Sequence, residues 1–205
     1  MTRRAALLFP GIIRWVSGSH FQGAELESSE LERFEAIVLP HLDAAYTLAR
    51  YLTSNTLDAQ DIVQDASLRA LKYFRGFRGT EPKDGRAWLL AIVRNTVRTW
   101  RQRRHPESAD TAFDEEQHSE RIADDGPAVN LDRKETRARL GEALEQLPDE
   151  FREVIVLRDV QDLSYQEISE VTGVPEGTVM SRLHRARQRL RRMLVRGGKT
   201  GERVI

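Results

Sequence analysis

Residues 163–194 read LSYQEISEVTGVPEGTVMSRLHRARQRLRRML, and this stretch decides the fold of the C-terminal part of the chain. Ser164 precedes Glu167 by three residues, the spacing of a capping box that starts a helix. Gly173 is placed to end that short helix, and Pro175 suits the first turn of a second one. A short helix, a glycine turn and a basic helix together predict a helix-turn-helix, a motif that places its second helix in the major groove of DNA.

The second helix is predicted to have an inner and an outer face. At 100° per residue, one apolar stripe is made of Val179, Leu183, Ala186, Leu190 and Met193. The opposite side carries hydrogen-bonding groups that can reach base edges, namely Ser181, His184, Arg185 and Gln188. Residues that suit phosphates better than bases are Thr178, Arg182, Arg187 and Arg189. The alternative is a solvated arginine-rich helix without a ligand.

Charge is distributed unevenly along the 205 residues, although the formal net charge is zero. Residues 86–105 contain six arginines and no acid, whereas residues 107–125 contain eight acids and one arginine. Such asymmetry indicates separate binding surfaces with a solvated segment between them. The chain has no cysteine, which excludes disulfides, thiol catalysis and cysteine-based zinc sites.

The N-terminal half is predicted to form three helices, over residues 30–52, 56–74 and about 86–104, with a Gly/Pro-rich loop before the third. Pro40 kinks or divides the first helix. In the second helix, Tyr73 is among the residues expected to face inward. The third helix has a stripe made of Leu89, Ile92, Val93, Thr96, Val97 and Trp100. Its opposite side, with Arg94, Arg98 and Arg101, is all positive and favours a polyanion as partner.

The rest of the chain completes an all-α architecture of two small helical domains. Residues 106–130 are acidic and poor in large apolar residues, which predicts a flexible linker. A helix over 131–147, with Leu140 and Leu144 inward, leads through Pro148 into a buried helix. Residues 1–28 are expected to be a poorly ordered extension, and 197–205 a short tail. The apolar run near the N-terminus is too short and interrupted to span a membrane.

The order of these segments resembles a known family. DAQDIVQDASLRALKYF and RAWLLAIVRNTVRTWRQRRH precede the acidic linker, and LPDEFREVIVLRDVQDLSYQEISEVTGVPEGTVMSRLHRARQRLRRML follows it. Over about residues 31–195 this order is similar to the extracytoplasmic-function (ECF) group of bacterial sigma-70 factors. The resemblance implies a sigma region 2-like helical bundle at 29–105, the flexible acidic linker at 106–130, and a sigma region 4-like helix-turn-helix domain at 131–196.

The resemblance also implies residue roles in the first domain. Asp61, Gln64 and Asp65 match positions that dock on the clamp helices of RNA polymerase, although the family commonly has Glu in place of Asp65. The helix over residues 88–104 is expected to recognise and open the −10 element. There Asn95 matches a position lining the pocket for a flipped-out base. The other residues expected at this element are Trp88, Arg94, Arg98 and Arg101; core packing is the alternative for Trp88.

The second domain is expected to read the −35 element through the outer face of its basic helix. The base contacts implied are those of Ser181, His184, Arg185 and Gln188, and the phosphate contacts those of Thr178, Arg182, Arg187 and Arg189. Family members often carry Arg or Lys where Met180 stands here. A methionine side chain cannot donate a hydrogen bond, so a base or phosphate contact is not expected at this position.

The implied partners are core RNA polymerase, promoter DNA and an anti-sigma factor, for a cytoplasmic monomer that is not inserted in a membrane. No cofactor, metal site or catalytic residue is expected. A stand-alone helix-turn-helix regulator, with a sensor or dimerisation domain in its first half, is the alternative function. A third hypothesis is that the protein is an enzyme. Two observations argue against it: the five histidines are scattered along the chain, and the sequence lacks a Gly-rich phosphate loop.

Overall fold

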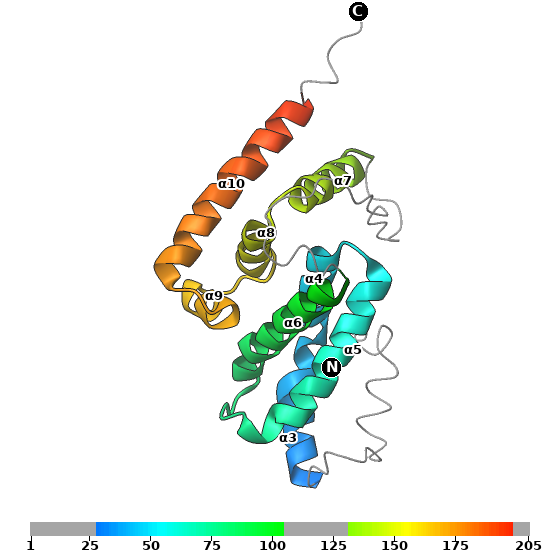
Figure 1. Cartoon of the computed structure of the whole chain (residues 1–205), viewed down its shortest axis with the longest axis vertical. Coiled ribbons are helices and arrows are strands. Elements are labelled where there is room, and N and C mark those ends of the chain that lie inside the picture. Colours follow the sequence, from blue (N-terminus) through cyan, green and yellow to red (C-terminus); the bar gives the residue numbers. More distant parts are fainter. Residues whose placement is uncertain (1–27, 105–130, 199–205) are drawn as a thin grey trace, which may run out of the picture.

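The computed structural model describes residues 28–104 and 131–198, and every regular element in these residues is a helix (Figure 1). The all-α prediction is therefore confirmed for this part of the chain. The predicted N-terminal extension, acidic linker and C-terminal tail lie outside the described residues, apart from residue 28 and residues 197–198.

The N-terminal module is a bundle whose helices lie within residues 28–104. Its elements are α3 (Ser28–Val38), η1 (Leu39–His41), α4 (Leu42–Thr53), α5 (Thr56–Tyr73), η2 (Phe74–Gly76) and α6 (Pro82–Arg104). Pro40 divides the predicted first helix into α3 and α4, because its ring cannot continue the α-helical hydrogen-bond ladder. Asn55 caps α5, its side chain accepting from the N–H groups of Leu57 and Asp58 at 2.8 and 3.1 Å.

Helix α6 begins at Pro82, earlier than the sequence predicted. The Asp84 carboxylate accepts hydrogen bonds from the backbone N–H groups of Thr80 and Glu81, both at 3.0 Å. Pro82 occupies the first turn, where its missing N–H is not needed. The Pro and Asp that suggested a loop are thus the start of the helix.

Two residues predicted to face inward are exposed. Tyr73 is 60% exposed, because Phe74 takes the inner position at the end of α5 and meets the Phe34 ring edge-on at 5.2 Å. Leu140 is 38% exposed, since its helix, α7 (Leu131–Glu145), packs mainly against α10 and lies at the edge of its module.

The C-terminal module contains the predicted helix-turn-helix. After α7 come α8 (Asp149–Ile155), a π-helical segment (Val156–Val160), α9 (Tyr165–Thr172) and α10 (Glu176–Gly198). Arg152 is 8% exposed and joins α8 to α7 by donating to the carbonyl groups of Leu144 and Leu147 at 2.9 and 3.0 Å, and also to that of Glu145. A single buried guanidinium thus donates to three carbonyl groups at and just after the end of α7, where the helical hydrogen-bond ladder stops.

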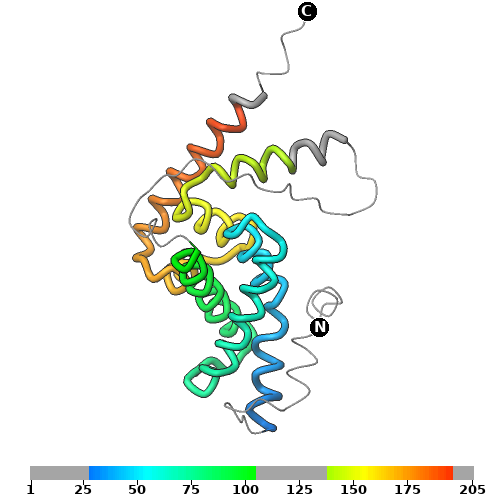
Figure 2. The backbone as a smooth tube through the Cα atoms, turned by 45° about the vertical axis from the view of Figure 1, so that its right-hand side comes forward, coloured from blue at the N-terminus to red at the C-terminus, as the bar shows by residue number. Residues whose placement is uncertain are grey.

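The two modules pack against each other, with the helix-turn-helix seated beside the N-terminal bundle (Figures 1 and 2). Helix α6 contacts α9, helix α4 contacts α8, and the buried apolar residues of both modules form one cluster. Leu90, which falls outside the predicted stripe of α6, is fully buried. Helix α6 is therefore covered on two sides, by its own bundle and by the second module.

Candidate nucleic-acid interface

The start and the turn of the helix-turn-helix are built as the sequence predicted. The Ser164 hydroxyl accepts from the Glu167 N–H at 3.2 Å, and the Glu167 carboxylate accepts from the Ser164 N–H at 2.7 Å, which is a complete capping box. Gly173 ends α9 with a φ of 69°, in the left-handed region. The Pro175 carbonyl then accepts from the N–H groups of Thr178 and Val179 in the first turn of α10.

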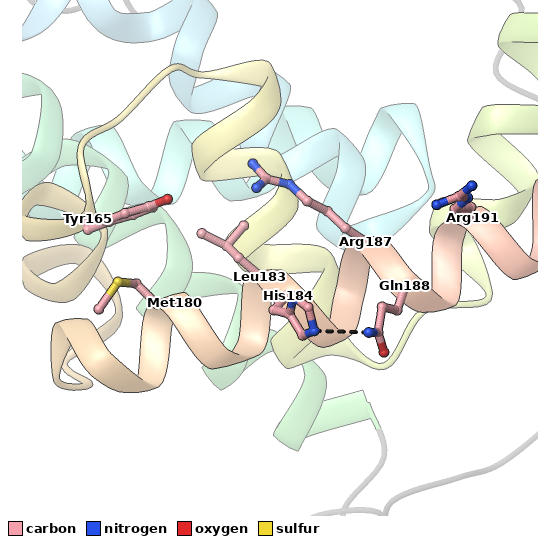
Figure 3. Close-up of a pocket in the computed structure, with 7 residues that line it drawn as sticks. All are labelled: Tyr165, Met180, Leu183, His184, Arg187, Gln188 and Arg191. Atoms are coloured by element: carbon pink, nitrogen blue, oxygen red, sulfur yellow. Dashed lines mark hydrogen bonds between the residues drawn. The ribbon is translucent and has the colours of Figure 1, made fainter.

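The outer face of α10 carries the four residues predicted to contact bases. Ser181, His184, Arg185 and Gln188 are all exposed, while Val179, Leu183 and Ala186 on the inner face are buried. His184 and Gln188 lie one helical turn apart, and their side-chain nitrogens are 2.9 Å apart in a hydrogen bond (Figure 3). This bond positions two side chains that are predicted to contact bases relative to each other.

The residues predicted to contact phosphates are mostly engaged within the module. Arg182 pairs with Glu150 at 2.8 Å, Arg187 pairs with Asp159 at 2.6 Å, and the Arg189 guanidinium lies 4.8 Å above the Phe151 ring. The hydrogen bond and charge of Asp159 raise the pKa of Arg187, so this guanidinium stays fully charged. Thr178, the remaining predicted residue, is half-buried at the start of α10. A phosphate would have to share or replace these carboxylate partners.

On α6, the residues predicted to read the −10 element divide into two groups. Asn95 and Arg98 are exposed, as a nucleic-acid contact requires. Arg94 and Arg101, in contrast, turn toward the C-terminal module. Arg94 donates to Glu153 of α8 at 2.6 Å, and Arg101 contacts Asp149 of α8 as well as the Leu52 carbonyl. The structure therefore does not bring the three arginines together on one open face.

The Arg94–Glu153 pair is the most buried ionic contact that the structure describes between the modules. The two side chains are 15% and 9% exposed. Burial raises the pKa of Glu153, while the adjacent Arg94 guanidinium opposes that rise, with Arg182 and Arg98 adding to the positive surroundings. A buried carboxylate of this kind is stable only with its cation in place, because desolvation penalises an unpaired charge strongly.

A second polar contact between the modules lies at the other end of the interface. Arg86 of α6 donates to the Gln161 carbonyl and, at 3.1 Å, to the Gln161 side-chain oxygen. Gln161 in turn donates from its amide to the Ala44 carbonyl of α4 at 3.1 Å. No sequence pattern indicates the contacts of Arg86, Gln161 or Glu153, since helical periodicity identifies outward residues but not the surface that they meet.

Trp88 belongs to an aromatic cluster in the N-terminal module. Its ring is half-buried and lies 4.7 Å from the Phe77 ring and 6.2 Å from the Phe74 ring. The guanidinium of Arg33 lies 5.0 Å above the Phe74 ring on the edge of the same cluster. Trp88 thus packs as core, with part of its surface left accessible.

The residues predicted to meet RNA polymerase lie on the open side of α5. Asp61 and Gln64 are exposed, and Asp65 forms an ion pair with Arg69 at 3.0 Å. A shallow groove of about 170 Å³ runs between α5 and α6, and Asp61 and Asp65 lie on its α5 wall and Arg103 on its α6 wall. This surface lies clear of the contact between the modules, which α6 makes with α9 and α4 makes with α8.

No group of His, Cys, Asp or Glu side chains within residues 28–104 and 131–198 is placed to hold a metal ion. Over the same residues, no helix combines the length and the apolar character that crossing a membrane requires.

Comparison with known proteins identifies both modules. The sigma-70 region 2 model matches residues 37–106, and the sigma-70 region 4 model matches residues 137–190. The ECF RNA polymerase sigma factor SigW of Bacillus subtilis is 30% identical over 179 residues, which are 83% of this chain and 93% of that protein. The ECF sigma factor SigE of Mycolicibacterium smegmatis is 34% identical over 177 residues, 83% of this chain but 65% of that longer protein.

A solved structure extends the comparison to three dimensions. The sigma factor RpoE of Bartonella quintana, solved in complex with the anti-sigma factor NepR, matches with a TM-score of 0.62 at 28% identity, over 76% of this chain and 92% of that one.

Proposed function

This chain belongs to the ECF RNA polymerase sigma factors, which direct core RNA polymerase to promoters, and we propose that it does so by reading two promoter elements with α6 and α10. The observation that carries the proposal is the presence, in one chain, of two helices with outward basic and amide side chains. Asn95 and Arg98 are exposed on α6, while Ser181, His184, Arg185 and Gln188 are exposed on α10.

The residue roles follow from the chemistry of each face. Asn95 offers one donor and one acceptor, so it can pair with the edge of a base that has left the stack. Extruding a base costs a few kcal/mol, and a pocket that hydrogen-bonds that base offsets the cost. Arg98 and, once released, Arg94 and Arg101 would hold the backbone beside it. On α10, the exposed amide, imidazole and guanidinium groups suit base edges in the major groove.

The contact between the modules restricts the access of α6 to DNA. Arg94 and Arg101 cannot reach DNA while they pair with Glu153 and Asp149. We therefore infer that the conformation described is a closed one, and that α6 reaches the −10 element only after the modules separate. The α5 surface with Asp61, Gln64 and Asp65 stays open in the closed form, so polymerase can dock there first.

The proposal also covers the cellular location, the oligomeric state and the protein partners of the chain. The chain acts in the cytoplasm as a monomer, bound to core polymerase, and supplies recognition while the polymerase supplies the chemistry. An anti-sigma factor is a second protein partner, by analogy with the Bartonella quintana complex.

A binding experiment tests the function directly. The full chain is mixed with labelled promoter DNA, with and without core polymerase, and complexes are resolved on a native gel. We expect sequence-specific binding that requires core polymerase. Specific binding to a palindromic site by the chain alone would contradict the proposal and favour a dimeric regulator.

Asn95→Ala tests the role of α6 in DNA opening. We expect initial promoter binding within about twofold of wild type and a loss of open complex of about fivefold or more, since a bidentate hydrogen-bond contact to a base is worth about 1–3 kcal/mol. Permanganate reactivity of unpaired thymines measures the opening. Gln146→Ala, an exposed amide at the end of α7, is the matched control. Normal opening by Asn95→Ala would remove this residue from the pocket.

A further inference from the structure

An apolar recess interrupts the charged surface of the recognition helix. It has a volume of about 380 Å³ and lies between the start of α9 and residues 180–191 of α10. Its apolar lining comes from Tyr165, Met180 and Leu183, and its polar rim from His184, Arg187, Gln188 and Arg191 (Figure 3). Leu183 forms the floor, since it is 2% exposed.

Met180 and Tyr165 are the accessible apolar groups of this recess. Met180 is 49% exposed and Tyr165 is 37% exposed, on a module whose other outward groups are mostly charged or polar. Met180 lies one turn before His184, on the same side of α10. An exposed thioether at this position is unexpected for a surface that needs only to be solvated, and it cannot bind a phosphate, because it has no donor.

We propose that Met180, backed by Tyr165, receives the C5-methyl group of one thymine in the −35 element and so reads that base pair. This inference rests on the proposed function, because it requires α10 to lie in the major groove at that element. The thymine methyl is the one apolar group that the four base pairs present in the major groove. A methionine suits it, since its flexible and polarisable side chain fills irregular apolar contacts.

The neighbours of the recess set the position of such a thymine. The hydrogen-bonded His184 and Gln188 stand beside Met180, so they are placed to contact the polar edges of the same or the adjacent base pair. Arg187 and Arg191 continue along the same side of the helix and add positive charge to the rim, although Arg187 is paired with Asp159 and a phosphate would have to share that partner. The recess is therefore an apolar spot inside a cationic reading surface. Replacing the thymine by cytosine would remove the methyl group from C5 and replace the neighbouring O4 acceptor by an amino donor, so the apolar contact would be lost.

The test removes the methyl group from the DNA and leaves its hydrogen-bonding edges unchanged. Holoenzyme is assembled from the full chain and core polymerase, and its −35 sequence is found by selection from randomised duplexes. Each thymine of the selected element is then replaced singly by deoxyuridine, and equilibrium binding is measured. We expect one position at which deoxyuridine weakens binding about fourfold, the effect of one buried methyl group at about 0.8 kcal/mol.

Variants of the protein test whether the thymine methyl group binds in the recess. Met180→Ala is expected to bind thymine and deoxyuridine equally at that position, because the apolar contact is gone. Val195→Ala, which shortens another exposed apolar residue of α10, is the matched control and should keep the fourfold difference. Both substitutions lie on the surface, so thermal unfolding should show equally folded proteins.

The possible outcomes separate this inference from the proposed function. Specific binding that no deoxyuridine weakens would overturn the inference and leave the function intact. A deoxyuridine effect that persists in Met180→Ala would assign the methyl contact to another residue and also overturn it. If holoenzyme bound no sequence specifically, the proposed function itself would fail, and the inference with it.

Discussion

Gly85 shows how one missing side chain sets the packing of the N-terminal module. It is buried in the first turns of α6, and a Cβ atom there would lie 2.3 Å from the Ile37 carbonyl oxygen and 2.6 Å from its Cγ2 atom. The close approach of α6 to α3 thus depends on glycine.

Gly85→Ala is expected to destabilise the protein by about 1–3 kcal/mol, the usual cost of overpacking a tight contact. The clash involves backbone, so it outweighs the better helix propensity of alanine. Urea unfolding measures the change. Gly177→Ala, where an added Cβ meets no atom within 4 Å, is the matched control and should leave stability unchanged or slightly raised. Equal stabilities for the two variants would contradict this reading of Gly85.

The environments of some single residues are predictable from the sequence, and those of others are not. The outward residues of α10 and the capping box were predictable, because helical period and local hydrogen bonding determine them. The pairing of Arg94 with Glu153 was not, since both look like ordinary surface charges in a helical pattern. Arg152 likewise looks like a surface residue by type, yet it is buried and donates to three carbonyl groups at and just after the end of α7.

Among the structural elements, the existence of each helix is predictable from the sequence, but the residues at which the helices begin and end are predicted less accurately. Pro40 was expected to kink or divide a helix, and it separates α3 from α4. The sequence predicts a start of α6 near residue 86, which is later than the observed start at Pro82. The reason is that Pro82 and Asp84 are equally suitable as loop residues and as residues of the first turn of a helix. Tyr73 was assigned to the inner face of α5, although Phe74 fills that place where the helix ends.

The junction between η1 and α6 should respond to pH through His41. Its Nε2 donates to the Pro82 carbonyl at 2.6 Å, and burial lowers the pKa of His41 from 6.5. A histidine with a lowered pKa binds its proton less readily in the native state than in the unfolded chain. Its contribution to stability is therefore complete above pH 6.5 and declines as the pH falls through the native pKa.

The predicted loss of stability on acidification is tested by urea unfolding at pH 7.5, 6.5 and 5.5. We expect the free energy of unfolding of wild type to fall toward pH 5.5 more steeply than that of His41→Gln, which cannot titrate at this position. The stability difference between the two proteins should therefore shrink or reverse on acidification. A difference that stays constant over this range would show that His41 does not titrate with a lowered pKa.

At the scale of the whole molecule, the sequence predicted two modules with separate basic faces, and the structure shows them packed together. The prediction of two domains came from the acidic segment between them, whose residues lie outside the described part of the chain. Nothing in periodicity or charge patterning shows which exposed faces will meet. The contact that covers Arg94 is thus a property of the tertiary structure alone.

Glu153→Gln is expected to open this contact. It removes the charge that pairs with the buried Arg94 guanidinium while keeping the size of the side chain, and the loss of a charged hydrogen bond costs about 1.5–3 kcal/mol. The ratio of open to closed molecules should rise by about tenfold or more. Because the chain has no cysteine, Lys72→Cys and Gln166→Cys allow one label to be placed on each module for energy transfer.

Lower energy transfer in Glu153→Gln than in wild type is the expected result, and core polymerase should lower it in both proteins. Glu150→Gln is the matched control, since Glu150 pairs with Arg182 inside the C-terminal module. The closed conformation would be contradicted by equal energy transfer in the Glu153 and Glu150 variants.

Run-off transcription tests the central claim, which is that this chain turns core polymerase into a promoter-specific enzyme. Purified full-length chain and core polymerase are incubated with a template carrying the selected promoter, and core activity is verified with another sigma factor. We expect a transcript of discrete length that depends on the chain and is reduced about fivefold or more by Asn95→Ala. A core enzyme that starts at no defined site on any template when this chain is added would contradict it.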